Sequence, residues 1–231
     1  MSLFEEVATH CPACKVEVSY EMVHSVNADR RSELRDAILD RSFQVLTCES
    51  CGENFRIEPQ FTYIHMVGKQ YFSVWPISSI GNWAAMEKRG DQSFLTFYGP
   101  ASSEAAQQIG REMVRRTVFG WAALREKIVA AAAGIDDVTL ELAKVAILRW
   151  ADGIEENADV EMRLLDVSED GLLIFGTYDP GSEAEGQQIT VPKDLLAEIE
   201  ADADGWKSLR ERLTDSSFVD AQRLQMSPEP V

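Results

Sequence analysis

The chain has 231 residues, of which 45% are hydrophobic and 26% charged, and it carries a formal net charge of −17. This balance is typical of a globular protein and excludes an extended disordered chain, and the length suits one large domain or two small ones. No stretch approaches the roughly 18 apolar residues of a membrane-spanning helix, and the first nine residues lack the basic start of a secretory signal. We therefore expect a cytoplasmic protein without membrane contact.

The four cysteines of the chain all fall in two Cys-x-x-Cys units, residues 11–14 and 48–51. Two such units can offer four thiolates to one tetrahedral Zn²⁺ at about 2.3 Å, with no position left for a substrate. Pro12 fixes φ in the first unit, and Gly52 supplies backbone freedom directly after the last cysteine. The sequence predicts a structural zinc site with the ligands Cys11, Cys14, Cys48 and Cys51.

Other uses of the cysteines fit the surrounding sequence less well. A redox dithiol would place its unit at the start of a helix, where the thiol pKa is lowered. Here alternating apolar residues follow both units, over 15–20 and 54–58, and predict strands. Two structural disulfides would need an oxidising compartment, and four buried free thiols would not need the doubled spacing. The context favours a zinc ribbon in which each unit opens a strand.

The N-terminal third is predicted to be a small, mostly antiparallel sheet with one helix inserted between the cysteine units. Residues 25–28 form a loop, and Asp29 caps a helix over 30–39. Gly68 and Lys69 form a two-residue hairpin turn. The predicted strands cover residues 15–22, 43–46, 54–58, 61–67 and 70–75.

Four motifs of this chain occur together in one known family. They are CPAC from residue 11, SVNADRRSELRDAIL from 25, FQVLTCESCGENF from 43 and LREKIVAAAAGIDDVTLELAK from 124. On these motifs the chain resembles the CpXC family of bacteria and archaea, named for its Cys-Pro-X-Cys motif. The resemblance covers about two thirds of the chain and implies a zinc-binding domain without catalytic residues to carry over. One departure is that no acidic residue stands next to His65, where the family pattern leads us to expect one.

The middle of the chain is predicted to be helical. Gly90 and Gly134 end the first and third helices, whereas residues 113–119 fit a helix or a strand. Asp136 and Asp137 fall at a helix start, where the helix dipole accounts for them. The predicted helices cover residues 79–89, 100–110, 120–133 and 138–148. The last of them is apolar nearly all round, which predicts the most buried segment of the protein.

The C-terminal third is strongly acidic. Residues 155–231 hold 19 acidic and 6 basic side chains and so carry −13 of the net charge. Residues 152–157 are the predicted linker. We expect a CpXC-like zinc-binding domain with central helices over 1–152, and an acidic α+β segment over 158–231 packed on it. Its strands are predicted over 160–167, 172–178 and 189–191. The fold class is α+β, with a zinc-ribbon-like antiparallel sheet, an inserted helix and central helices.

The cysteine region gives little support to nucleic-acid binding. Residues 11–60 hold 9 acidic and 6 basic side chains, whereas a ribbon that grips phosphates needs a basic face. The chain also lacks the P-loop, dinucleotide, HExxH and GxSxG motifs.

We therefore expect a non-enzymatic protein-interaction module with a structural Cys₄ zinc site, binding another protein with a basic surface. The alternatives are a zinc-ribbon regulator associated with nucleic acid, and an enzyme with a cleft between the two halves. The sequence leaves the identity of the partner, the pathway and the oligomeric state open.

Overall fold

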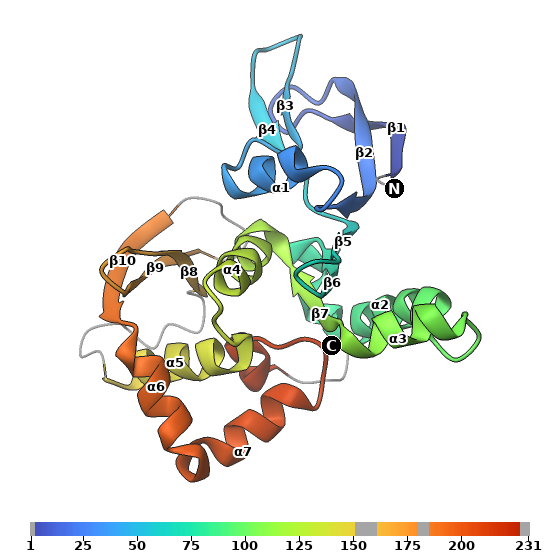
Figure 1. The fold of residues 1–231 in the computed structure, drawn as a ribbon. Coiled ribbons are helices and arrows are strands. Elements are labelled where there is room, and N and C mark those ends of the chain that lie inside the picture. Colours follow the sequence, from blue (N-terminus) through green and yellow to red (C-terminus); the bar gives the residue numbers. More distant parts are fainter. Residues whose placement is uncertain (1–2, 151–160, 180–184, 227–231) are drawn as a thin grey trace. The chain divides into compact units, whose positions relative to one another are not determined.

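The computed structural model of the chain describes residues 3–150, 161–179 and 185–226 (Figure 1). In these residues the fold is α+β, as predicted, with seven α-helices and three sheets. The chain divides into two compact units, the first made of Met1–Pro76 and Lys88–Arg115, the second of Ile77–Glu87 and Arg116–Val231. The predicted linker over 152–157 lies outside the described residues, so the boundary placed there stays a prediction. No helix in the described ranges has the length and hydropathy to cross a membrane.

The largest sheet has five strands in the order β1-β2-β5-β6-β7 (Figure 1). These strands are β1 (Leu3–His10), β2 (Glu17–Asn27), β5 (Phe61–His65), β6 (Gln70–Trp75) and β7 (Val114–Phe119). The β1–β2 and β5–β6 pairs are antiparallel, as predicted for this region, but β2 and β5 pair in parallel. β1 is not among the predicted strands, and β7 resolves the ambiguous segment over 113–119 as a strand.

The region between the cysteine units follows the predicted order, with one correction. β2 continues to Asn27 where a loop was expected over 25–28, because this end of the strand pairs with β5 through Ser25 and Thr62 and through Asn27 and Ile64. The helix buries Ile38, and the two short strands pair antiparallel as a separate hairpin. These inserted elements are α1 (Ser32–Leu39), β3 (Val45–Thr47) and β4 (Asn54–Arg56).

Asp29 does not cap α1, contrary to the prediction. The helix begins after Arg31, with no side-chain cap. Asp29 instead accepts hydrogen bonds from the N–H groups of Met66 and Val67, at 2.6 and 3.1 Å. Its carboxylate also lies 3.5 Å from Nε2 of His65. A distant part of the chain therefore supplies the acidic neighbour that His65 lacks in the sequence.

Two predicted turns are also wrong. The register pairs His65 with Gln70, so the β5–β6 loop has four residues, 66–69, instead of two. The helix α2 (Trp83–Tyr98) continues through Gly90, which is buried within it. It ends at Tyr98, and the N–H of the following Gly99 donates to the carbonyl oxygen of Leu95 at 2.9 Å. A glycine inside a helix costs roughly 1 kcal/mol relative to alanine but does not by itself end the helix.

The helices predicted over 120–133 and 138–148 agree with the structure to within two residues, whereas the helix predicted over 100–110 begins at Glu104. The Ser103 side chain caps α3 by accepting from the N–H of Ala106 at 3.3 Å. Gly134 follows α4 with a φ of +65°, a conformation in which glycine carries no Cβ penalty. The remaining helices are α3 (Glu104–Glu112), α4 (Gly120–Ala132), α5 (Asp137–Trp150), α6 (Asp194–Ala201) and α7 (Ala203–Thr214), with 3-10 turns η1 (Ile77–Asn82) and η2 (Ala221–Gln225).

The second unit contains a three-stranded antiparallel sheet in the order β10-β9-β8. Its strands are β8 (Glu161–Val167), β9 (Leu172–Tyr178) and β10 (Glu185–Pro192). The helix α4 packs on β8, and α5 contacts α6 and α7 (Figure 1). Every residue from 138 to 144 is buried, with Leu140 and Leu142 fully inaccessible. α5 is therefore largely buried, as predicted, but among the described residues α4 buries as many, so α5 is not the most buried segment. Two of the buried residues of α5, Glu141 and Lys144, are charged.

Candidate metal centre

The four cysteines meet at the ends of two hairpins. The first Cys-x-x-Cys unit connects β1 to β2, and the second connects β3 to β4. Sγ of Cys11 lies 3.7 Å from Sγ of Cys51, and Sγ of Cys14 lies 3.6 Å from Sγ of Cys48. All four sulfur atoms lie within 4.8 Å of one another. The structure thus gathers the four predicted ligands, two from each Cys-x-x-Cys motif, into a single cluster.

The two Cys-x-x-Cys motifs fold into matching turns. In the first, the N–H of Lys15 donates to the carbonyl oxygen of Cys11 at 3.0 Å; in the second, the N–H of Gly52 donates to that of Cys48 at 2.8 Å. Lys15 and Gly52 both have a left-handed backbone, with φ of +62° and +76°. Each turn therefore uses the residue directly after its second cysteine to reverse the chain and present two thiols on one side.

The cluster has an inner and an outer half. The first cysteine of each unit, Cys11 and Cys48, is buried, whereas Cys14 and Cys51 are exposed. All four are free thiols, because their separations far exceed the 2.05 Å of a disulfide bond. A strand follows each Cys-x-x-Cys motif. Neither motif therefore stands at a helix start, where a redox dithiol would have its thiol pKa lowered.

Backbone N–H groups lower the pKa values of the thiols, whereas burial and the crowding of sulfur atoms can raise them. The N–H of Cys14, helped by that of Ala13, lowers the pKa of Cys11 to about 7 against the effect of burial. The N–H of Glu53 lowers the pKa of Cys51, but the neighbouring thiols and burial outweigh it and raise this pKa to about 12. One thiolate is therefore stabilised by the backbone, whereas further ionisation needs a nearby positive charge.

The donor set fits a tetrahedral metal ion. Four sulfur atoms at about 2.3 Å from one Zn²⁺ are roughly 3.8 Å apart, and two of the separations in the cluster are 3.6 and 3.7 Å. Soft thiolate ligands select Zn²⁺ over Mg²⁺ or Ca²⁺, and the ion would supply the positive charge that complete ionisation of the four thiols needs. The residues that would hold it are Cys11, Cys14, Cys48 and Cys51.

A second polar cluster, which the sequence analysis missed, lies in the second unit. We call it the buried ion network. It consists of five acids and four bases whose side chains are at most 19% exposed: Arg116, Glu126, Lys127, Asp137, Glu141, Lys144, Glu161, Arg163 and Asp220.

The centre of the network is a chain of alternating charges. Nζ of Lys144 lies 2.8 Å from Oε1 of Glu126 and 2.6 Å from Oε2 of Glu141. Nη1 of Arg163 lies 3.1 Å from the same Glu126 oxygen and 2.6 Å from Oδ2 of Asp220. Each buried charge therefore faces at least one opposite charge at hydrogen-bond distance, which is the condition under which ion pairs are tolerated in a protein interior.

Backbone groups complete the network. Nζ of Lys127 donates to the carbonyl oxygen of Val219 at 2.8 Å. Glu126 accepts from the N–H of Leu164 at 2.7 Å, and Glu141 accepts from that of Ala221 at 2.9 Å. The network thereby ties β8 and the segment before η2 to α4 and α5, which gives it a structural role.

Asp137 belongs to this network, so the helix dipole alone does not account for it. Its carboxylate makes two hydrogen bonds to Arg116, at 2.6 and 2.8 Å, and lies 3.1 Å from Nζ of Lys127. Burial raises the pKa of Asp137, but the two cations outweigh burial and hold it well below its usual value. Asp136, by contrast, acts as predicted at the start of α5, since its Oδ1 accepts from the N–H of Thr139 at 2.8 Å.

One signal for the network was present in the sequence. Glu126 and Lys127 stand inside a predicted helix, and Glu141 and Lys144 stand three residues apart in the helix that was predicted to be the most buried. Charged residues in a helix without a polar face have to pair inside the protein. The four helical residues are therefore expected to form buried pairs, but nothing in the sequence marks Arg163 or Asp220 as their partners.

The comparisons with known proteins agree with the cysteine geometry. A family model described as CpXC protein matches residues 9–144, which include both cysteine units and extend to Lys144 of α5. Neither the curated proteins nor the solved structures contain a significant match. Because the family match covers more than half of the chain, the protein belongs to the CpXC protein family.

Proposed function

We propose that the chain is a non-enzymatic protein-interaction module whose first unit is stabilised by one zinc ion in a zinc-ribbon-like Cys₄ site. The observation that carries this proposal is the convergence of four thiols from two hairpin ends to within 4.8 Å. Four thiolates complete the coordination of Zn²⁺ and leave no position for a substrate, which is typical of structural zinc sites and not of catalytic ones.

The size of the second hairpin supports a structural role for the metal. β3 and β4 have three residues each and pair with each other as a separate two-stranded sheet. An isolated two-stranded hairpin is marginal in water. A zinc ion shared between the two cysteine units would fix this hairpin to the β1–β2 hairpin and so order the chain between them.

Exposed apolar side chains support a role in protein binding. Nine of the ten exposed large hydrophobic residues of the described chain belong to the first unit. Among them Val67 is 84% exposed, Phe97 61% and Leu95 48%. Contiguous exposed apolar patches mark surfaces that bind other proteins, and we propose that Leu95 and Phe97 belong to such a surface.

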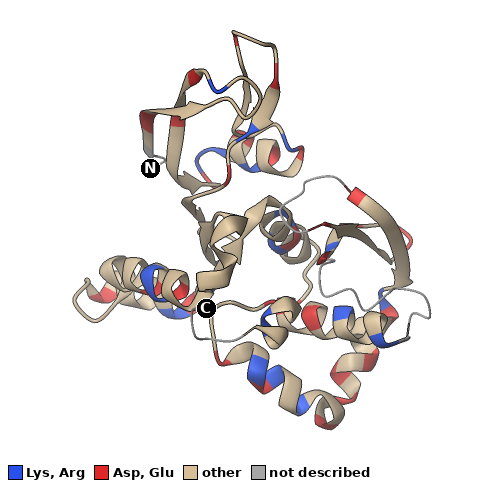
Figure 2. Ribbon diagram, turned by 180° about the vertical axis from the view of Figure 1, so that it is seen from behind, with Lys and Arg blue, Asp and Glu red and all other residues tan. Residues whose placement is uncertain are grey.

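The charge of the second unit indicates the nature of the partner. α6 has acidic residues and no basic ones (Figure 2), and the net charge of the chain is −17. We therefore propose a protein partner with a basic surface, which long-range electrostatic attraction would bring to this chain.

Metal analysis tests the first part of the proposal. The purified chain should contain one zinc ion, and X-ray absorption should find four sulfur ligands at about 2.3 Å. The variant Cys48→Ser should lose the metal, whereas Ser50→Ala, within the same turn, should keep it. A disulfide within one unit, or a zinc ion with water as a ligand, would contradict the proposal.

Reconstituted binding tests the second part. A partner isolated from the native host should bind the purified chain directly, and Leu95→Ser with Phe97→Ser should weaken that binding about tenfold or more because both side chains are proposed to be covered. Leu148→Ser, at an exposed position of the second unit, is the matched control. If the purified chain instead binds duplex DNA with a steep dependence on salt, the nucleic-acid alternative replaces this proposal.

A further inference from the structure

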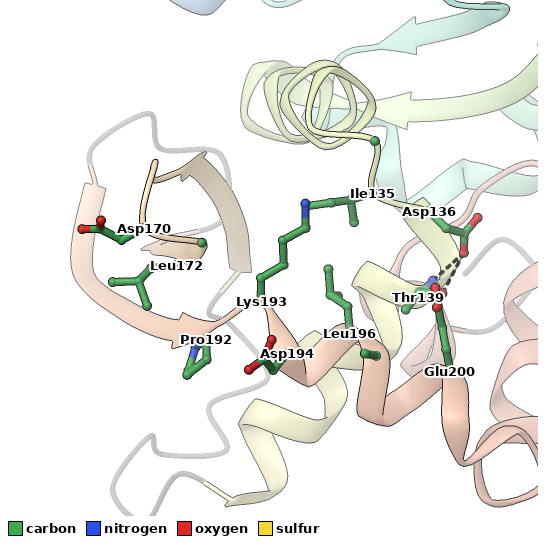
Figure 3. A pocket seen from close by; sticks show the side chains of 13 residues that line it. Ile135, Asp136, Thr139, Asp170, Leu172, Pro192, Lys193, Asp194, Leu196 and Glu200 are labelled. Carbon is green, nitrogen blue, oxygen red and sulfur yellow. Dashed lines mark hydrogen bonds between the residues drawn. The ribbon is translucent and has the colours of Figure 1, made fainter.

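The second unit contains a cleft of about 550 Å³ (Figure 3). Its walls are the turn after α4, the turn between β8 and β9, and the first turns of α6. The N–H of Lys193 donates to the carbonyl oxygen of Gly171 at 2.9 Å, so a hydrogen bond joins two of these walls directly. The cleft is thus formed by the fold itself, and its volume lies in the range of binding pockets for small ligands and side chains.

The cleft combines apolar and acidic linings. Ile135, Leu172 and Leu196 contribute apolar side chains, and Asp194 and Glu200 project from α6 (Figure 3). Within the described part of the chain, neither of these two carboxylates forms an ion pair. An uncompensated carboxylate beside an apolar wall favours a ligand that is apolar along its length and positively charged at its end.

The chain already places one such group in the cleft. Lys193 is the single basic residue among those that line it. Its side chain extends toward the backbone near Ile135 (Figure 3), and Nζ donates to the carbonyl oxygen of Ala133 at 3.3 Å. Ala133 is the residue that caps the C-terminal end of α4, where carbonyl groups and the helix dipole attract cations. Lys193 therefore shows how the cleft holds a long basic side chain.

We propose that this cleft binds a lysine or arginine side chain from a basic segment of the protein partner. This inference rests on the proposed function, for which it supplies the site of contact. The aliphatic part of one basic side chain packs on Leu172 and Leu196 and its charged end pairs with Asp194. A second basic side chain of the same segment pairs with Glu200, because residues six apart on one helix lie about 9 Å apart along its axis. Both parts of the ligand are matched, because long basic side chains bury their methylene groups and keep their charge near polar groups.

The test uses the full-length, zinc-loaded chain and a fluorescein-labelled nonapeptide of alternating arginine and alanine, with binding measured by fluorescence anisotropy. The double variant Asp194→Asn, Glu200→Gln should bind the peptide about tenfold more weakly, since two charge pairs are lost. The control Glu198→Gln, Asp204→Asn changes the net charge equally and also alters one first-turn aspartate, but both its residues lie outside the cleft. It should bind like the unmodified chain.

A third variant gives an effect of opposite sign. Lys193→Gln removes the internal cation that competes for the cleft, so it should bind the peptide a few-fold more tightly. Circular dichroism and the zinc content of each variant separate lost binding from lost folding.

The outcomes separate this inference from the proposed function. Equal weakening in the cleft variant and the control means that attraction is spread over the surface and overturns the cleft as the site. Absence of peptide binding by the unmodified chain overturns it as well. Neither result affects the proposed function, which is decided by zinc content and by the Leu95 and Phe97 variants with the isolated partner.

Discussion

The first unit gathers four cysteine side chains at the ends of two hairpins, whereas the second buries nine charged side chains around α4 and α5. The polar cluster of the second unit supplies its own counter-charges, because each of its charged groups lies at hydrogen-bond distance from at least one opposite charge. The cysteine cluster of the first unit consists only of thiol groups that can act as metal ligands. It needs a cation nearby before all four thiols can ionise. The charged groups of one unit are thus paired within the protein, whereas the thiols of the other form a donor set that fits a metal ion.

The apolar residues show the same contrast. The large hydrophobic core of the chain lies in the second unit, where residues of α5, α6, α7, β8 and β9 pack together. The first unit exposes nine large apolar residues and the second only Leu148, counted over the described residues. Exposed apolar side chains in the unit that holds the cysteine cluster are what the proposed function predicts.

Removal of the metal should have the largest effect and should be confined to the first unit. Structural zinc sites contribute roughly 10–16 kcal/mol of apparent binding free energy at neutral pH. A chelator, or Cys48→Ser, should therefore abolish hydrogen-exchange protection over residues 11–76, while α4 and α5 remain protected. Exchange measured by mass spectrometry with and without the chelator checks this. Unchanged protection over 11–76 would show that the metal is not structural.

Breaking the ion network should affect the second unit alone. Glu126→Gln preserves the size of the side chain but leaves Lys144 and Arg163 with one counter-charge fewer. Removing one partner of a buried ion pair typically costs about 3–5 kcal/mol. Urea unfolding followed by hydrogen exchange should show this loss in α4, α5 and β8, with unchanged zinc content. Glu112→Gln, at an exposed ion pair with Lys69, is the control and should cost at most about 1 kcal/mol.

The two clusters also differ in how far the sequence predicts them. The spacing of the cysteines and the alternation of apolar and polar residues after each Cys-x-x-Cys motif are local signals. The strand predicted after each motif is present in the structure. The ion network depends on contacts between residues such as Glu126 and Arg163, which come together only when α4 packs on β8. The same reason explains β1 and the parallel β2–β5 pair, because strand pairing is decided by distant partners.

Stability of the second unit should be highest across a broad pH range. Burial opposes the charge on Asp137, Asp220 and Glu126, but neighbouring cations outweigh it and lower all three pKa values. These groups stabilise the fold above their unfolded pKa, near 4, and this contribution is lost as the pH falls through their folded values. Nearby carboxylates overcome burial and raise the pKa of Lys127 and Lys144. Their contribution is complete below about 10.5 and is lost as the pH rises further.

Glu141 acts in the opposite sense, since burial raises its pKa and its ionisation opposes folding. The free energy of unfolding of the second unit should thus fall at acid pH, as Asp137, Asp220 and Glu126 are protonated, and fall again above about pH 10.5, as Lys127 and Lys144 lose their protons. Denaturant titrations at constant ionic strength check this. In Asp137→Asn the acid limb should become shallower, and an unchanged acid limb would contradict the assignment.

The smallest expected effect concerns the matching turns of the cysteine units. Lys15 and Gly52 occupy equivalent left-handed positions, but only glycine adopts this backbone without strain. A Cβ at Gly52 would meet no atom within 4 Å, so the cost of Gly52→Ala is conformational and should be about 1 kcal/mol. Lys15→Gly should have the opposite sign and stabilise the zinc-loaded first unit by up to about 1 kcal/mol.

Thermal unfolding of the zinc-loaded variants measures both changes. Lys15 also donates from Nζ to the carbonyl oxygen of Pro12 at 2.8 Å, an exposed hydrogen bond that Lys15→Gly removes. Lys15→Met removes the same bond and keeps the strained backbone, so it isolates that contribution. If Lys15→Gly lowers the melting temperature more than Lys15→Met does, left-handed strain at this position is not the dominant factor, and the two turns are equivalent in geometry but not in energy.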